Sequence, residues 1–118
     1  ELMMHVALGG QAEESERFFD AMAQYGVEYD IIGQSYYPEW HGTLEELEIN
    51  TRALVERYGK PLIVVEYRDH YLAIERIVSS LPNGLGRGTF IWEATSPDWG
   101  KLFDRSGQAT PALDDYNN

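Results

Sequence analysis

The sequence repeats one pattern four times: a strand-like apolar run, a loop, and a segment with the hydrophobic period of a helix. The strand-like runs cover residues 2–8, 30–37, 61–69 and 88–94. A unit of roughly thirty residues is the size of a βαβ step, and runs that are apolar almost throughout are typical of parallel strands covered by helices. The pattern therefore predicts an α/β fold of four consecutive βα units in a single segment, residues 1–118.

Helices are predicted over residues 13–25, 43–58 and 70–81, with a short last helix beginning at Pro111. The second of these helices has the clearest boundaries. Thr43 and Glu46 have the spacing of a capping box at its start, and Gly59 follows its last apolar residue.

Two architectures fit four such units. One is a small doubly wound sheet, and the other is half of an eight-fold barrel, because a whole (β/α)8 barrel takes about 250 residues. The chain of 118 residues opens inside an apolar run without an initiator Met or a signal peptide. We therefore expect it to be a piece of a longer protein.

Composition narrows the classes of partner and of chemistry. The net charge of −11 should repel nucleic acid and anionic membrane, and no apolar run is long enough to span a bilayer. The absence of cysteine rules out disulfides and thiolate chemistry. No phosphate loop, HExxH or GxSxG motif is present, and the histidines lack a metal spacing, so we predict no cofactor and no metal.

Chemically capable residues gather where the predicted strands end, which is where both architectures place their sites. Glu66 is the most informative, because a carboxylate after a buried run costs several kcal/mol to desolvate unless it is paired or used. Others have structural alternatives: His5 as a hydrogen-bonded core residue, Trp40 as a helix cover, and Glu93 as an ion-pair partner of Arg87 or another base. Aromatic rings that stack on sugars, together with carboxylates, suit glycoside hydrolysis, which uses two carboxyl groups.

The run DIIGQSYYPEWHGTLEELEINTRALVERYGKPLIVVE, residues 30–66, resembles the arabinogalactan endo-β-1,4-galactanases of glycoside hydrolase family 53. The resemblance extends to MMHVALGG near the start and to GRGTFIWEA at residues 86–94. It implies that the chain is the C-terminal half, strands 5–8, of a (β/α)8 barrel. It also implies a secreted or periplasmic parent enzyme that hydrolyses a β-linked galactan or a related polysaccharide.

The resemblance assigns roles to individual residues. Glu66 falls at the position of the catalytic nucleophile, while the family's acid/base Glu, in an Asn-Glu pair, would precede residue 1. The residues implied to bind substrate are His5, Ser35, Tyr36, Tyr37, Trp40, Trp92 and Glu93.

The sequence departs from the family at two loops. Tyr67, Arg68 and Asp69 lead directly into a helix, where the family has Thr-Ala-Tyr and a long loop that holds calcium in some members. We therefore do not carry calcium over. Ala94 follows Trp92-Glu93 where the family usually has Pro and a further Trp, and here Trp99 comes later. These departures leave another β-linked substrate open.

Three hypotheses follow. The first is a retaining endo-β-1,4-galactanase in which this chain carries the nucleophile half of the site and is inactive alone. The second makes Glu66 and Glu93 themselves the catalytic pair. The third is a non-catalytic carbohydrate-binding or interaction domain with a flavodoxin-like sheet. A half barrel should also self-associate through its open sheet edge.

Overall fold

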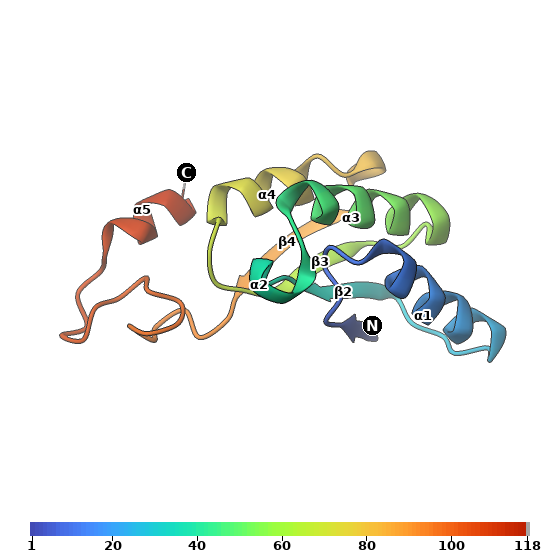
Figure 1. The fold of residues 1–118 in the computed structure, drawn as a ribbon, viewed down its shortest axis with the longest axis horizontal. Coiled ribbons are helices and arrows are strands. Elements are labelled where there is room, and N and C mark those ends of the chain that lie inside the picture. The colour runs from blue at the N-terminus through green and yellow to red at the C-terminus, as the bar shows by residue number, and fades with distance from the viewer. Residues whose placement is uncertain (118) are drawn as a thin grey trace.

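The structure is a computed structural model that describes residues 1–117, and its strands form one parallel sheet in the order β1-β2-β3-β4 (Figure 1). The strands are β1 (Met3–Val6), β2 (Ile31–Ser35), β3 (Leu62–Tyr67) and β4 (Gly86–Ile91). β1, β2 and β3 each lie within a predicted run, whereas β4 begins and ends earlier than the predicted run of residues 88–94. All three neighbouring pairs are parallel, which confirms the predicted succession of βα units.

The helices follow the strands in alternation: α1 (Ala12–Gln24), α3 (Leu44–Tyr58), α4 (Tyr71–Ser79) and α5 (Pro111–Asn117). The predicted capping box is present, since the side chains of Thr43 and Glu46 each accept from the other's backbone N–H. Gly59 ends α3 in the left-handed conformation at a φ of 63°. Two short elements, α2 (Pro38–His41) and the 3-10 turn η1 (Pro82–Gly84), were not predicted, because segments so short carry no hydrophobic period.

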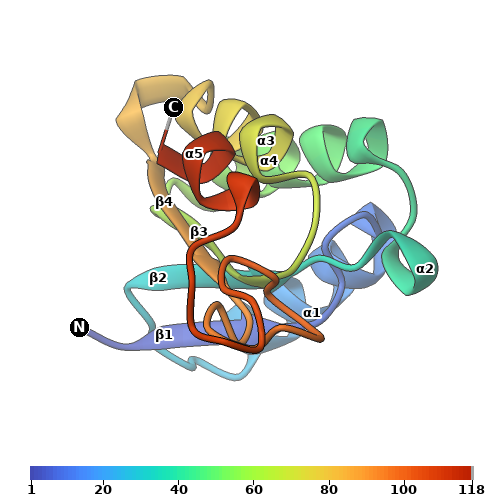
Figure 2. The same ribbon diagram turned by 90° about the vertical axis from the view of Figure 1, so that its left-hand side faces the viewer.

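The long helices cover only one face of the sheet. Sequential strand order with right-handed crossovers places successive helices on the same side, and Figures 1 and 2 show α3 and α4 side by side there. A doubly wound sheet requires a reversal in strand order, and the order β1-β2-β3-β4 has none. The flavodoxin-like alternative is therefore wrong for this chain.

The hydrophobic core lies between the sheet and these helices. Ile32, Leu62 and Val64 point from the strands into the core and are fully buried. They pack with fully buried residues of the helices, which include Phe19, Leu47, Leu54 and Ile74. This layer holds the strands in register and so fixes where their carboxyl ends lie.

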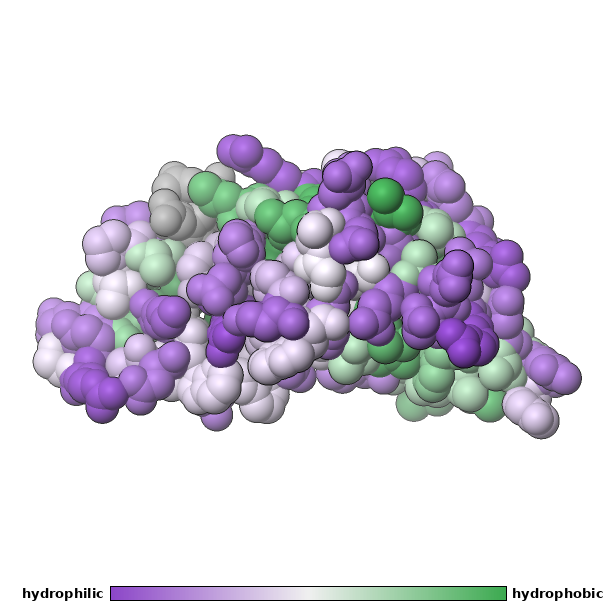
Figure 3. Space-filling model, viewed as in Figure 1, coloured by the Kyte–Doolittle hydropathy of each residue, from purple (hydrophilic) through white to green (hydrophobic). Residues whose placement is uncertain are grey.

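The opposite face of the sheet is open. Phe90, between the helix-facing Thr89 and Ile91, is 63% exposed, and Met3 is 41% exposed. In Figure 3 hydrophilic residues cover most of the helical side, and hydrophobic residues gather along the lower edge, near the N-terminal strand. The open face thus presents apolar side chains that no described helix covers.

Candidate active site

One extra residue in β3 decides where Glu66 points. Gln34 of β2 is paired with Val64, but the next residue, Ser35, is paired with Glu66. The pairing of β3 with β4 shifts in the same interval, between Val64 and Tyr67. Strict alternation would place Glu66 on the covered face with Leu62 and Val64. The extra residue turns it to the open face and sends Tyr67 into the core instead.

Glu66 is held there by the tyrosine that follows β2. The hydroxyl of Tyr37 donates to Oε1 of Glu66 at 2.8 Å, and the contact is partly buried. Burial and this hydrogen bond raise the pKa of Tyr37 well above its ordinary value, so the hydroxyl stays protonated and remains a donor. One oxygen of Glu66 is thus engaged by Tyr37.

His41 fixes the turn that presents Tyr37. Its side chain is 8% exposed, and its Nδ1 accepts from the backbone N–H of Tyr37 at 3.1 Å. Only a neutral ring can accept there, and burial lowers the pKa of His41 in agreement with that role. His41 was not among the predicted site residues, although it stands in the same run as Tyr37.

His5 and Ser35 meet on the open face next to Glu66. The Nε2 of His5 lies 2.6 Å from Oγ of Ser35, and Ser35 is the residue paired with Glu66. Gly33 makes room for this approach, because a Cβ there would lie 2.8 Å from Sδ of Met3 and 3.3 Å from Cβ of His5. The structure therefore brings His5, Ser35, Tyr37 and Glu66 together on the open face, where the strands reach their carboxyl ends. We call this end of the sheet the rim.

Tyr36 lies away from this group. It is 1% exposed, packs in the core, and donates from its hydroxyl to the carbonyl of Gly42 at 2.9 Å. Consecutive residues of a strand point to opposite faces, so Tyr36 and Tyr37 cannot both reach the rim. The core position of Tyr36 leaves no ring face for a sugar, and the expected contact does not fit this geometry.

The three exposed aromatic and acidic candidates lie farther out. Trp40 is 63% exposed on α2 and packs edge-on against Tyr37, with ring centroids 5.5 Å apart. Trp92 is 45% exposed just past β4, and Glu93 follows in a turn at a φ of 45°. Within residues 1–117 no ion pair joins Glu93 to Arg87. These side chains are thus accessible to solvent around the rim.

Arg68 and Trp99 also lie at the rim, and both follow predicted strands, but the sequence assigned neither of them a role in the site. The Cζ of Arg68 lies over the rings of Tyr37 and Trp99, 5.9 Å and 5.0 Å from their centroids. Its position depends on the segment after β4, which Figure 2 shows in front of the strand ends. No local sequence signal marks such a contact across 31 positions of the chain.

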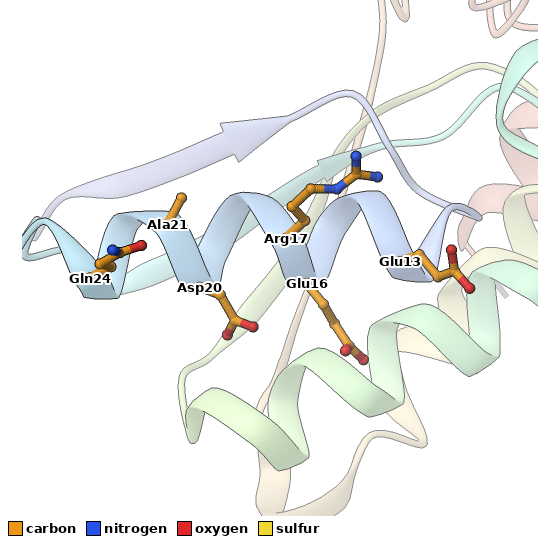
Figure 4. A pocket seen from close by; sticks show the side chains of 6 residues that line it. All are labelled: Glu13, Glu16, Arg17, Asp20, Ala21 and Gln24. Carbon is orange, nitrogen blue, oxygen red and sulfur yellow. The ribbon is translucent and has the colours of Figure 1, made fainter.

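The hollow shown in Figure 4 is not part of the rim. Its lining residues all come from α1, among them Glu16, Arg17 and Asp20, and none follows a strand. Within the described part of the chain, no three His, Cys, Asp or Glu residues are grouped as metal ligands. No helix among residues 1–117 combines the length and apolarity needed to cross a bilayer.

Comparison with known proteins places these observations in a family. The sequence model of Glycosyl hydrolase family 53 matches residues 1–75. The chain is 37% identical to an uncharacterised protein of Niallia circulans over 83% of its length, and 39% identical to an endo-β-1,4-galactanase of Bacillus subtilis over 46%. It spans 35% and 13% of the lengths of those proteins.

Solved structures share the fold. The GH53 catalytic domain of Ignisphaera aggregans superposes with a TM-score of 0.84 at 24% identity, over 97% of this chain and 45% of that one. A fungal β-1,4-galactanase gives 0.85 at 22% identity, over 97% and 46%. The likeness confirms the predicted fold class, in which the four βα units are part of a (β/α)8 barrel.

Proposed function

The chain belongs to glycosyl hydrolase family 53, and from that premise we propose that Glu66 is the nucleophile of a retaining glycosidase. The observation that carries the proposal is the extra residue in β3, which turns Glu66 out of the core and against the hydroxyl of Tyr37 at 2.8 Å. Glu66 is thus turned away from the core, held by a hydrogen bond and partly accessible. These properties suit nucleophilic attack on a sugar.

The reaction proceeds in two displacements. Glu66 attacks the anomeric carbon, the bond to the leaving oxygen breaks, and a carboxylic acid protonates that oxygen. Water then attacks the glycosyl-enzyme after giving a proton to the same second carboxylate, and Glu66 is released. Retention requires the two carboxyl groups about 5–5.5 Å apart. We place the second carboxylate in the part of the barrel that this chain does not contain.

Tyr37 and its neighbours prepare Glu66 for this step. The hydroxyl of Tyr37 stabilises the ionised carboxylate by donating to one oxygen, which leaves the other oxygen for the anomeric carbon. The pair of His5 and Ser35 offers hydroxyl and imidazole groups to the sugar hydroxyls beside it. Trp40, Trp92 and Glu93 would contact the sugar chain farther out along the rim.

We infer from the relatives that the substrate is a β-1,4-linked galactan. Two of the relatives are an endo-β-1,4-galactanase of Bacillus subtilis and an arabinogalactan endo-β-1,4-galactanase of Cellvibrio japonicus, which is 35% identical over 56% of this chain. A polysaccharide of this kind is too large to cross a cell membrane intact. We therefore place the enzyme outside the cytoplasm, secreted or periplasmic.

The decisive experiment identifies the covalent intermediate in a complete barrel that includes this chain. A 2-deoxy-2-fluoro-galactoside with a good leaving group should inactivate the enzyme and label the peptide that contains Glu66. Glu66→Gln should abolish galactan hydrolysis while sugar binding persists, whereas Glu93→Gln should keep turnover. Full turnover by Glu66→Gln, or a label on another residue, would overturn the assignment.

An activity assay of the isolated 118-residue chain distinguishes the two enzymatic hypotheses. Without a second carboxylate opposite Glu66 the chain should not hydrolyse galactan or an aryl β-galactoside. Activity of the isolated chain that Glu93→Gln removes would favour the pair Glu66 and Glu93.

We further propose that the isolated chain self-associates. Strands β1 and β4 are the two edges of the sheet, and the open face between them carries the exposed side chains of Met3 and Phe90. Light scattering coupled to size exclusion should show a dimer or larger species that dissociates on dilution. A monomer at all concentrations would contradict this proposal.

A further inference from the structure

Arg68 makes cation–π contacts with two aromatic rings at the rim. Its Cζ lies 5.0 Å from the ring centroid of Trp99 and 5.9 Å from that of Tyr37. Its Nη2 pairs with Glu39, and its Nε lies 3.4 Å from Oδ2 of Asp69. The side chain is 21% exposed, so the guanidinium is held on several sides at once. Two carboxylates already balance its charge, which disfavours a role in binding an acidic ligand.

The residues around Arg68 hold the segment that carries Trp99. Asp69 lies 3.9 Å from Nζ of Lys101, and the hydroxyl of Tyr71 donates to the carbonyl of Gly100 at 2.6 Å. Gly100 also packs tightly against the turn after β4, since a Cβ there would lie 2.5 Å from the carbonyl oxygen of Glu93. Residues 99–101 therefore rest on the start of the β3–α4 connection.

A continuous set of contacts joins Trp99 to the proposed nucleophile. Glu66 accepts from Tyr37, the ring of Tyr37 faces Arg68, and Arg68 stacks on Trp99. Trp99 keeps 42% of its surface exposed, so part of the ring remains free for a ligand. A ring fixed before binding loses less freedom when a ligand stacks on it.

We propose that Arg68 is a positioning residue that holds Trp99 as a sugar-stacking surface at the rim that carries Glu66. The ligand class is a β-linked pyranose chain, whose apolar ring face stacks on an indole. Arginine suits this role better than lysine, because its planar guanidinium stacks on an aromatic face while its edge keeps both carboxylates bound. The inference rests on the proposed function of Glu66 and adds a determinant of chain-length preference.

The test is a series of β-1,4-galacto-oligosaccharides from the trimer to the hexamer, with the complete enzyme. Arg68→Gln should raise KM by about threefold to thirtyfold, the range expected for a lost cation–π contact, only for chains long enough to reach Trp99. The turnover number kcat should stay within about twofold. Arg105→Gln is the matched control, since Arg105 pairs with Asp98 in the same segment and makes none of the cation–π contacts found among residues 1–117.

A double-mutant cycle shows whether Arg68 acts through Trp99. Trp99→Ala should give the same chain-length signature, and Arg68→Gln should add nothing to it. Additive effects, or an equal rise in KM for every chain length, would overturn the inference. If Arg68→Gln does not fold, Arg68→Lys carries the same test and should show a weaker effect.

The outcomes separate this inference from the proposed function. If Glu66→Gln is inactive and Arg68→Gln keeps the KM values of the native enzyme, only the role of Arg68 is overturned. Active Glu66→Gln would remove the proposed nucleophile, whatever the oligosaccharide series shows.

Discussion

The two faces of the sheet use the same strands in opposite ways. On β3, Leu62 and Val64 point to the helices and are fully buried, whereas Ile63 and Glu66 on the open face are only half-buried. The covered face is held by apolar packing, and the rim of the open face is held by hydrogen bonds such as that between Tyr37 and Glu66. Substitutions on the covered face should change stability, and substitutions at the rim of the open face should change catalysis.

The largest effect expected is at Leu62. Leu62→Ala leaves a cavity among fully buried side chains and should lower the free energy of unfolding by about 2–5 kcal/mol. Ile63→Ala, one residue along on the open face, is the matched control and should lose clearly less. Urea denaturation of both variants measures the difference. Equal losses would break the distinction between the faces.

Tyr37→Phe comes next, and its effect should appear in kinetics. Removing a hydrogen bond to a charged group costs about 1.5–3 kcal/mol, which corresponds to a loss of about tenfold to a hundredfold in kcat/KM. The free energy of unfolding should fall by no more than the free energy of this hydrogen bond. Tyr25→Phe, at an exposed site, is the control and should behave as the native enzyme. A variant that is unstable but fully active would assign Tyr37 to the core instead.

The pH dependence of His41 is a smaller effect. Its pKa is lowered in the folded state, so the unfolded chain binds more protons and stability rises with pH. The contribution is present above the unfolded pKa of about 6.5 and is lost as pH falls through the folded pKa. Thermal melts between pH 7.5 and 5 should show a loss of stability as the pH falls.

His41→Asn should flatten this pH dependence. His70→Asn is the matched control, because His70 is exposed and its left-handed φ of 63° suits Asn. An unchanged slope in His41→Asn would show that another group dominates the pH dependence of unfolding.

The smallest change is expected at Phe90. Phe90 is 63% exposed, so Phe90→Ser should alter the free energy of unfolding of the dilute chain by no more than about 0.5 kcal/mol. In a closed barrel the same substitution would lie in the interior and cost more. A large loss in the isolated chain would show that something already covers the open face there.

The comparison of faces also explains what the sequence could predict. The strands and the long helices follow from hydrophobic period, and the capping box at Thr43 marked the start of α3. Alternation places Tyr36 and Tyr37 on opposite faces, but the run Gln-Ser-Tyr-Tyr contains no aliphatic residue that marks which of the two faces the core. The turn at His41 was missed because a helix of four residues has no period.

Other features lie beyond any local pattern. The run Leu-Ile-Val-Val has no polar residue to show alternation, so nothing in it marks the extra residue before Glu66. The place of Arg68 depends on Trp99, which the chain brings back from a later loop. Such contacts depend on tertiary structure and become visible only once the strands are paired.

The extra residue in β3 has a consequence for anyone who transplants or aligns this strand. A graft that copied Leu62 to Glu66 onto a regular strand would point the carboxylate into the packed layer. An alignment that closes a gap at this point matches the residue types but assigns the wrong direction to the side chain of Glu66. For barrel design, the number of residues before the acid is as much a part of the site as the acid.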